Sequence, residues 1–195
     1  MKRHLIVFLL LVTAAGMSAQ DRDLPQLSIK TNALGWSMAV TNVAVEIDIA
    51  EDWSVNIPLY YSGFDYFTET LKFRTVTVQP EIRYHFPTVN GLFVGAHLGL
   101  GWFNMAYGDW RIQDSRRPAY GGGFGVGYKL PFRSNPRWAV EFEIGAGVYD
   151  VAYDKFYNEK NGPLYAGNIR KAFFGIDNAA VTFSYSIDLK KEGRR

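Results

Sequence analysis

The sequence predicts an all-β protein, specifically an eight-stranded antiparallel up-and-down transmembrane β-barrel. Eight segments alternate apolar and polar residues with a period of two, which is typical of strands whose two faces meet different surroundings. The polar faces are also rich in glycine, as the crowded interior of a narrow barrel requires. The aromatic content of 16% fits the girdles at the two edges of a membrane barrel.

Residues 73–105 show the alternation most clearly. Ile82 lies on one face of the first strand, whereas Glu81 and Arg83 lie on the other. Residues 87–91 include an Asn-Gly pair, which tolerates positive φ and predicts a tight turn. Both strands exceed the roughly five or six residues usual in soluble proteins, and about nine to eleven residues cross a bilayer when tilted.

The same alternation recurs along the chain. We expect strands at residues 27–33, 42–49, 53–62, 75–86, 92–103, 120–130, 138–149 and 179–189. The connections after the second, fourth and sixth strands are short. Residues 63–72, 106–118 and 150–171 form longer connections, which predicts periplasmic turns at one end and extracellular loops at the other. An even number of strands closes a barrel with both termini on one side.

Residues 1–19 are predicted to form a cleaved secretory signal peptide, and residues 20–195 a single barrel domain. Lys2 and Arg3 precede an apolar run that is too short to span a membrane. The formal net charge of +2 falls to about zero when these two residues leave, which argues against a nucleic-acid partner. No helix-length apolar run follows, and the absence of cysteine excludes disulfides and thiolate metal sites. The predicted location is the outer membrane.

Ionic side chains share the predicted interior face of the strands. Both signs are present, so pairing across the lumen offsets the cost of removing them from water. About eight strands leave room only for side chains, so we expect a filled lumen without a large pore. The predicted lumenal ion-pair network comprises Lys30, Glu46, Asp48, Glu81, Arg83, Lys129, Glu141, Glu143 and Asp188.

Several motifs admit catalytic interpretations that we find weaker. The glycines of residues 121–127 lack the pattern of a phosphate-binding loop and are better explained as lining a narrow lumen. Glu141 and Glu143 resemble a hydrolase pair, but residues two apart in any strand share a face. His97 is the candidate base of a lipid-modifying enzyme, although it lies on the lumenal face. We therefore predict no enzyme, no cofactor and no metal site.

Aromatic residues of the three long connections are candidates for binding a partner, because binding residues concentrate on loops of rigid scaffolds. The alternative is that they form only the outer aromatic belt. The candidates are Phe64, Tyr66, Phe67, Trp110, Phe156 and Tyr157, with Tyr165 beside them.

Residues 29–34, 45–47, 53–56, 78–84 and 121–129 resemble a family of uncharacterised Bacteroidetes outer-membrane barrels, a domain of unknown function. The resemblance implies an eight-stranded outer-membrane barrel, frequent encoding near fimbrial subunits, and no established catalytic residue. One departure is the polar tail at residues 190–195, because most outer-membrane barrels end on an aromatic residue that the insertion machinery reads.

Together these observations predict a non-enzymatic outer-membrane barrel with a structural, adhesive or fimbria-associated role through its extracellular loops. Its expected partners are outer-membrane lipid, the barrel insertion machinery, and fimbrial or other surface proteins. Two alternatives remain: a lipid-modifying barrel enzyme, and a soluble periplasmic lipocalin-like ligand binder, since alternation alone does not decide which face meets lipid.

Overall fold

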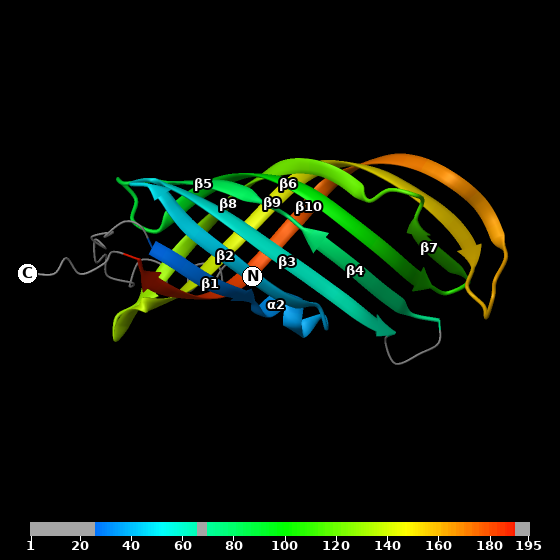
Figure 1. The fold of residues 1–195 in the computed structure, drawn as a ribbon, viewed down its shortest axis with the longest axis horizontal. Helices are drawn as coiled ribbons and strands as arrows, with labels where there is room; N and C mark the ends of the chain where they lie inside the picture. The colour runs from blue at the N-terminus through cyan, green and yellow to red at the C-terminus, as the bar shows by residue number, and fades with distance from the viewer. Residues whose placement is uncertain (1–25, 66–69, 190–195) are drawn as a thin grey trace, which may run out of the picture.

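The computed structural model describes residues 26–65 and 70–189, and this part of the chain is all-β with one short helix (Figure 1). The elements are β1 (Gln26–Asn32), α2 (Ala33–Ser37), β2 (Thr41–Ala50), β3 (Trp53–Asp65), β4 (Lys72–Val78), β5 (Glu81–His85), β6 (Leu92–Tyr107), β7 (Trp110–Asp114), β8 (Ala119–Phe132), β9 (Asn135–Tyr157) and β10 (Leu164–Asp188).

The strands form one antiparallel sheet that closes into a ring. β1 pairs with β2 and β2 with β3, β9 pairs with β10, and β1 also pairs with β10, from Gln26 opposite Asp188 to Asn32 opposite Thr182. β4 and β5 both lie between β3 and β6. β7 and β8 likewise both lie between β6 and β9. The ten described strands therefore occupy eight positions around the ring, in agreement with the eight predicted segments.

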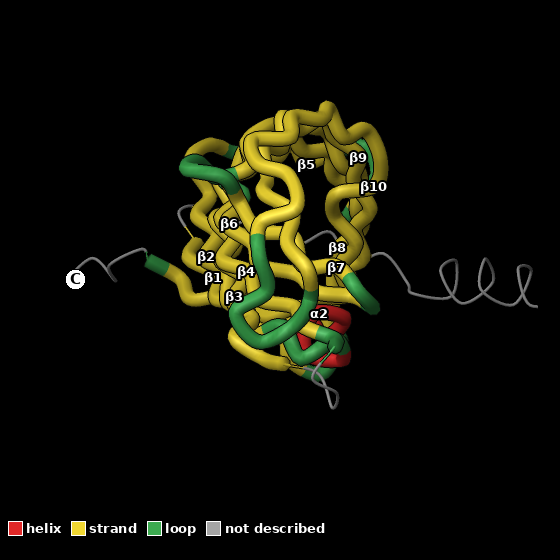
Figure 2. The backbone as a smooth tube through the Cα atoms, turned by 90° about the vertical axis from the view of Figure 1, so that its right-hand side faces the viewer, coloured by secondary structure: helices red, strands yellow, loops and turns green. Residues whose placement is uncertain are grey.

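The two faces of the sheet have opposite character. The strands surround a common interior (Figure 2), in which Lys30, Glu46, Arg83 and Glu141 are all buried. Large apolar side chains instead face outward at every position of the ring. They include Ile29, Val45, Ile57, Ile82, Val94, Val126, Ile144 and Phe183. The period-two alternation of the sequence thus separates a polar interior from an apolar exterior.

Two of the three predicted long loops, residues 106–118 and 150–171, are largely strand, and this part of the sequence prediction was wrong. Only residues 158–163 separate β9 from β10, because Val151 pairs with Lys171 and Tyr153 with Ile169. Residues 106–118 include the end of β6 and all of β7, joined by a turn at Gly108, whose φ is +57°. These strand extensions lie beyond the closed part of the ring, so their two faces no longer meet sharply different surroundings. The apolar–polar alternation therefore fades, although the backbone pairing continues.

Two further features were not predicted. The strand expected at residues 75–86 is interrupted at Gln79 and Pro80, because proline has no N–H to donate to the ladder. Its carbonyl still accepts from Leu98 N at 3.0 Å, so β6 stays continuous across the break. After β1 the chain forms α2, and the Asn32 side chain caps it by accepting from the N–H of Leu34, the second helical residue, at 3.0 Å.

The described residues contain no helix with the length and apolar character that crossing a membrane requires. The predicted signal peptide at residues 1–19, the candidates Tyr66 and Phe67, and the tail at residues 190–195 lie outside the described part of the chain.

Candidate functional site

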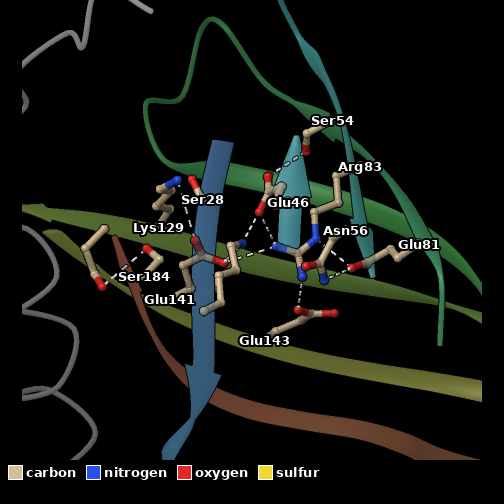
Figure 3. A network of polar contacts seen from close by, with 12 residues as sticks. Ser28, Glu46, Ser54, Asn56, Glu81, Arg83, Lys129, Glu141, Glu143 and Ser184 are labelled. Atoms are coloured by element: carbon tan, nitrogen blue, oxygen red, sulfur yellow. Dashed lines mark hydrogen bonds and ion pairs between the residues drawn. The ribbon is translucent and has the colours of Figure 1, made fainter. Parts of the chain in front are cut away.

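Arg83 on β5 is the centre of a buried ion cluster inside the ring (Figure 3). Its Nε donates to Glu81 Oε2 at 2.6 Å and its Nη2 to Glu143 Oε2 at 2.6 Å. Its Nη1 donates to Glu141 Oε2 at 3.0 Å and to Glu46 Oε2 at 3.2 Å. One guanidinium therefore joins four carboxylates, which a fork of five N–H donors makes possible.

Two lysines complete the cluster from other strands. Lys30 on β1 forms ion pairs with Glu46 and with Glu141 Oε2, the latter at 2.6 Å. Lys129 on β8 lies 3.6 Å from Glu141 Oε1. We call Lys30, Glu46, Glu81, Arg83, Lys129, Glu141 and Glu143 the interior ion cluster. Its members come from β1, β2, β5, β8 and β9, so it connects strands on opposite sides of the ring.

Neutral side chains donate further hydrogen bonds to three of the four glutamates. Ser54 Oγ donates to Glu46 Oε1 at 2.6 Å. Since a serine hydroxyl has one hydrogen, the 2.9 Å contact between Ser54 Oγ and His85 Nε2 requires the histidine nitrogen to be the donor. Asn56 Nδ2 donates to Glu81 Oε2 at 3.2 Å, and Asn178 Nδ2 donates to Glu143 Oε1 at 2.6 Å. These hydrogen bonds offset much of the cost of burying four carboxylates.

Glycine on the inner faces provides the room for these large side chains. A Cβ at Gly95 would collide with the Glu81 carboxylate, and one at Gly127 would collide with the Phe93 ring. That ring is fully buried and lies under the Arg83 guanidinium, 4.4 Å from its Cζ. The predicted role of the glycines, lining a narrow lumen, agrees with these contacts.

The structure brings together seven of the nine residues predicted for the lumenal network. The exceptions lie toward the turn end of the ring. Asp48 is half-buried opposite Ser54. Asp188 is exposed at the rim, where it accepts from Gln26 at 2.9 Å and from Arg137 at 3.4 Å. The prediction for Asp188 was wrong because facing inward does not bury a residue at the last position of a strand.

A second polar layer lies between the ion cluster and the loop end, and sequence reasoning identified only His97 within it. His97 Nε2 lies 2.6 Å from Asp177 Oδ2, which also accepts from the Tyr149 hydroxyl at 2.9 Å. Gln79 Nε2 in turn donates to Tyr149 Oη at 3.2 Å. The contacts of His97 that the structure describes include no serine hydroxyl, and nucleophilic catalysis needs one or an equivalent group.

Three of the predicted binding aromatics lie at the loop end of the ring, on strands rather than in loops. The Trp110 ring is 5.2 Å from that of Tyr157 and 4.9 Å from that of Tyr165. Phe156 lies under the guanidinium of Arg111 at 4.5 Å. Asn158 Nδ2 donates to both Thr70 O and Gly108 O, so three connections are tied together here. Phe64, at the end of β3, is separate and exposed.

The ion pairs of the interior ion cluster connect strands across the ring. Within residues 26–65 and 70–189, no group of three or more histidines and carboxylates is arranged to hold a metal ion. A void beside the ion cluster, lined by Lys30, Arg83 and Glu143 among others, has a volume of about 20 Å³, enough for a single water molecule. The side chains of the interior ion cluster occupy the centre of the ring.

A protein-family model described as "Protein of unknown function (DUF3575)" matches residues 5–187. No curated protein matches the chain significantly, and neither does any solved structure.

Proposed function

The chain belongs to the DUF3575 family, proteins of unknown function, and from that premise we propose that it is a non-enzymatic outer-membrane β-barrel. In this proposal the ring spans the membrane as an eight-stranded up-and-down barrel. The interior ion cluster closes it to solutes, and the loop end performs a structural or adhesive role.

The observation that carries the proposal is the inverted distribution of side chains. Lys30, Glu46, Arg83 and Glu141 are buried inside, whereas large apolar residues are exposed around the whole outer surface. A soluble protein rarely exposes an apolar patch larger than a few hundred square ångströms. A bilayer, in contrast, stabilises a continuous apolar exterior and requires a sheet with no free edge across the hydrocarbon.

Aromatic side chains at the turn end support the same placement. Trp53 packs against Tyr84 at 5.1 Å between ring centroids, and Trp138 packs against Tyr185 at 4.9 Å. Tryptophan and tyrosine concentrate at membrane–water interfaces because their rings are apolar and their N–H or O–H groups are polar. On β9 the outward residues from Trp138 to Val148 then form the span, which has about the length that a tilted strand requires.

The loop end is the part of the proposed barrel that reaches the cell exterior. β9 and β10 continue well beyond β1 and β2, as Figure 1 shows. Trp110, Tyr157 and Tyr165 form an aromatic cluster there, on a scaffold of paired strands. Fimbrial or other surface proteins are the partner class to test first, because exposed aromatic residues on rigid scaffolds are frequent binding anchors.

The experiment that tests membrane placement is the gel mobility of the outer-membrane fraction, unheated against boiled. A closed barrel resists detergent until it is heated, so we expect the protein in that fraction with two mobilities. A protein found in the soluble periplasm with a single mobility contradicts the proposal. That result favours the lipocalin-like alternative, in which the interior is examined for a ligand.

The non-enzymatic part has its own test, which targets the candidate base of the rival enzyme. His97→Ala in cells is expected to leave lipid A composition unchanged, as measured by mass spectrometry. A lipid A species that disappears with this substitution, while the two gel mobilities persist, supports the lipid-modifying enzyme instead.

A further inference from the structure

A cavity of about 810 Å³ lies at the loop end of the ring, beyond the second polar layer. Its walls come from β4, β6, β7 and β9, and they include Leu71, Phe73, Met105, Trp110, Ile112 and Tyr153. Small-molecule sites typically have volumes of roughly 300–1,000 Å³, with mostly apolar walls and a few polar groups. The size and lining of this cavity therefore fit a ligand with a long apolar part.

Two lysine side chains indicate the charge that a ligand of this cavity should carry. Lys72 and Lys155 line the cavity, and none of its described lining residues is acidic. The Lys155 ammonium is held 3.5 Å from the centroid of the Trp110 ring and 5.1 Å from that of Tyr165. No described carboxylate forms a salt bridge with either lysine. Positive charge in an apolar cavity favours a ligand whose apolar part carries an anionic group.

On one side of this cavity two strands of the ring end earlier than their neighbours, and we call this gap the low wall. β1 ends at Asn32 and β2 begins at Thr41, whereas the flanking β10 and β3 continue toward the loop end (Figure 1). The Asn32 side chain extends the ladder by one step, since it donates to Ala179 O at 3.2 Å and accepts from Val181 N at 3.1 Å. Beyond that point no described strand pairs with this edge of β10.

The surfaces beside the low wall are apolar. Phe174 and Ile176 on β10 are 80% and 66% exposed, and Trp36 on α2 is 53% exposed. Met38, which follows α2, is also exposed and lines the cavity itself. An apolar path therefore leads from the outer surface of the ring over α2 to the cavity.

We propose that this cavity binds an acyl chain of an anionic amphiphile. The chain lies against Phe73, Met105 and Ile112, and the anionic group lies beside Lys72 and Lys155. The inference rests on the proposed membrane location, because the low wall over α2 then lies at the outer edge of the bilayer, from which an acyl chain can reach the cavity. A free fatty acid and an acylated lipid share this chemistry, and the experiment separates them.

The test uses the full-length mature protein, first shown to have two gel mobilities, in phosphatidylcholine nanodiscs. A palmitate analogue with a diazirine near the end of its chain is photoactivated, and labelled peptides are mapped by mass spectrometry. We expect saturable labelling of the β6–β7 and β9 peptides that excess palmitate removes. Competition by an acylated anionic lipid such as phosphatidylglycerol, but not by palmitate, assigns the site to lipid rather than to free fatty acid.

Matched variants locate the site. Ile112→Trp adds an indole ring to the cavity wall against which the chain is proposed to lie, and it is expected to reduce labelling several-fold, because a large side chain there overlaps the proposed position of the chain. Val126→Trp adds the same bulk on the outer face of β8 and is expected to leave labelling unchanged. Replacing Lys72 and Lys155 by Gln should weaken palmitate binding by about two- to fivefold without affecting hexadecanol, which has no charge.

Each outcome decides between the two proposals. Labelling confined to the outer faces of the strands, or equal labelling of Ile112→Trp and the wild type, overturns the ligand site while the membrane barrel stands. A protein without the two gel mobilities that still binds palmitate from water, with the same sensitivity to Ile112→Trp, retains the ligand site and overturns the membrane location.

Discussion

Among single residues, Arg83 has the largest effect on the interior. Its guanidinium contacts Glu46, Glu81, Glu141 and Glu143, each on a different strand except the last two. Lysine could not replace it, because one ammonium has three donors and no planar fork. Removing one partner of a buried ion pair leaves charges that are neither paired nor hydrated, and this costs more than the pair itself contributes.

Arg83→Met should therefore lower the free energy of unfolding by about 3–5 kcal/mol. The folded fraction in a urea titration, read from the two gel mobilities, measures the loss. Arg74→Met is the matched control, because Arg74 is exposed and its pair with Asp65 should contribute less than about 1 kcal/mol. Equal losses in the two variants would contradict a central role for Arg83.

Gly123 offers a second prediction at this scale. A Cβ at this position would collide with the carbonyl of Ala146 and lie 2.7 Å from Gly147 Cα, both in the backbone of β9. Gly123→Ala should therefore cost about 1–3 kcal/mol in the same urea titration, because the backbone must move. At Gly101 the nearest atom is Thr77 Oγ1 at 3.3 Å, so Gly101→Ala should cost less. A larger loss at Gly101 would contradict this account.

Sequence alone predicted much of the interior at the level of residues, since strand periodicity assigns each residue to a face. It identified seven members of the ion cluster in this way. Periodicity does not show how far a residue lies from the rim of the ring along its axis. For this reason Asp188, at the end of β10, was wrongly assigned to the buried network. Periodicity also missed Asp177, which a register shift between Ile176 and Asn178 turns toward His97 and Tyr149. A β-bulge of this kind interrupts the period and leaves no pattern to detect.

Among the elements, the β9–β10 hairpin shows the same limit of periodicity. Residues 150–171 were predicted to form a loop because their alternation is weak, yet they pair from Val151 opposite Lys171 onward. Backbone hydrogen bonds hold a hairpin whatever its faces meet, whereas the sequence pattern arises only where one face is buried. Strand ends are therefore the least predictable part of this fold.

Replacing residues 154–168 by Asn-Gly should leave the ring intact. The change joins Tyr153 to Ile169, which already face each other, through a two-residue turn that suits a tight hairpin. We expect both gel mobilities to persist, because the removed residues lie beyond the ion cluster. Palmitate labelling should be lost, since the deletion removes Lys155 together with the part of β9 that pairs with β7 in the cavity wall. Loss of the two mobilities would show that the extension is needed to form the ring.

At the scale of the whole molecule, the closed ring has its polar residues inside and its apolar residues outside. The sequence predicted this arrangement, including the eight positions and the pairing of the first strand with the last. It did so because every strand repeats the same alternation, and only closure satisfies both edges of the sheet. The short helix α2 was not predicted, since five residues carry no helical period.

The filled interior predicts that the protein forms no large, steady pore. In planar bilayers the wild type should show no stable conductance, because the interior ion cluster occupies the centre of the ring. The recordings should use protein from preparations with both gel mobilities, and a porin measured in parallel serves as the positive control. A large and stable conductance would contradict the closed interior.

The pairing of β1 with β10 also determines when the molecule can form. Gln26 and Asp188 are 162 residues apart, and Lys30 and Glu141 are 111 apart, so the first contact needs nearly the whole chain and the second needs most of it. Until that moment the charged residues remain hydrated, and a partly paired sheet cannot enter hydrocarbon at low cost. Contacts this distant in sequence are slow to form. In the proposed membrane barrel, the pairing of β1 with β10, the neutralisation of the buried charges and the transfer into the bilayer would thus be one late and cooperative step.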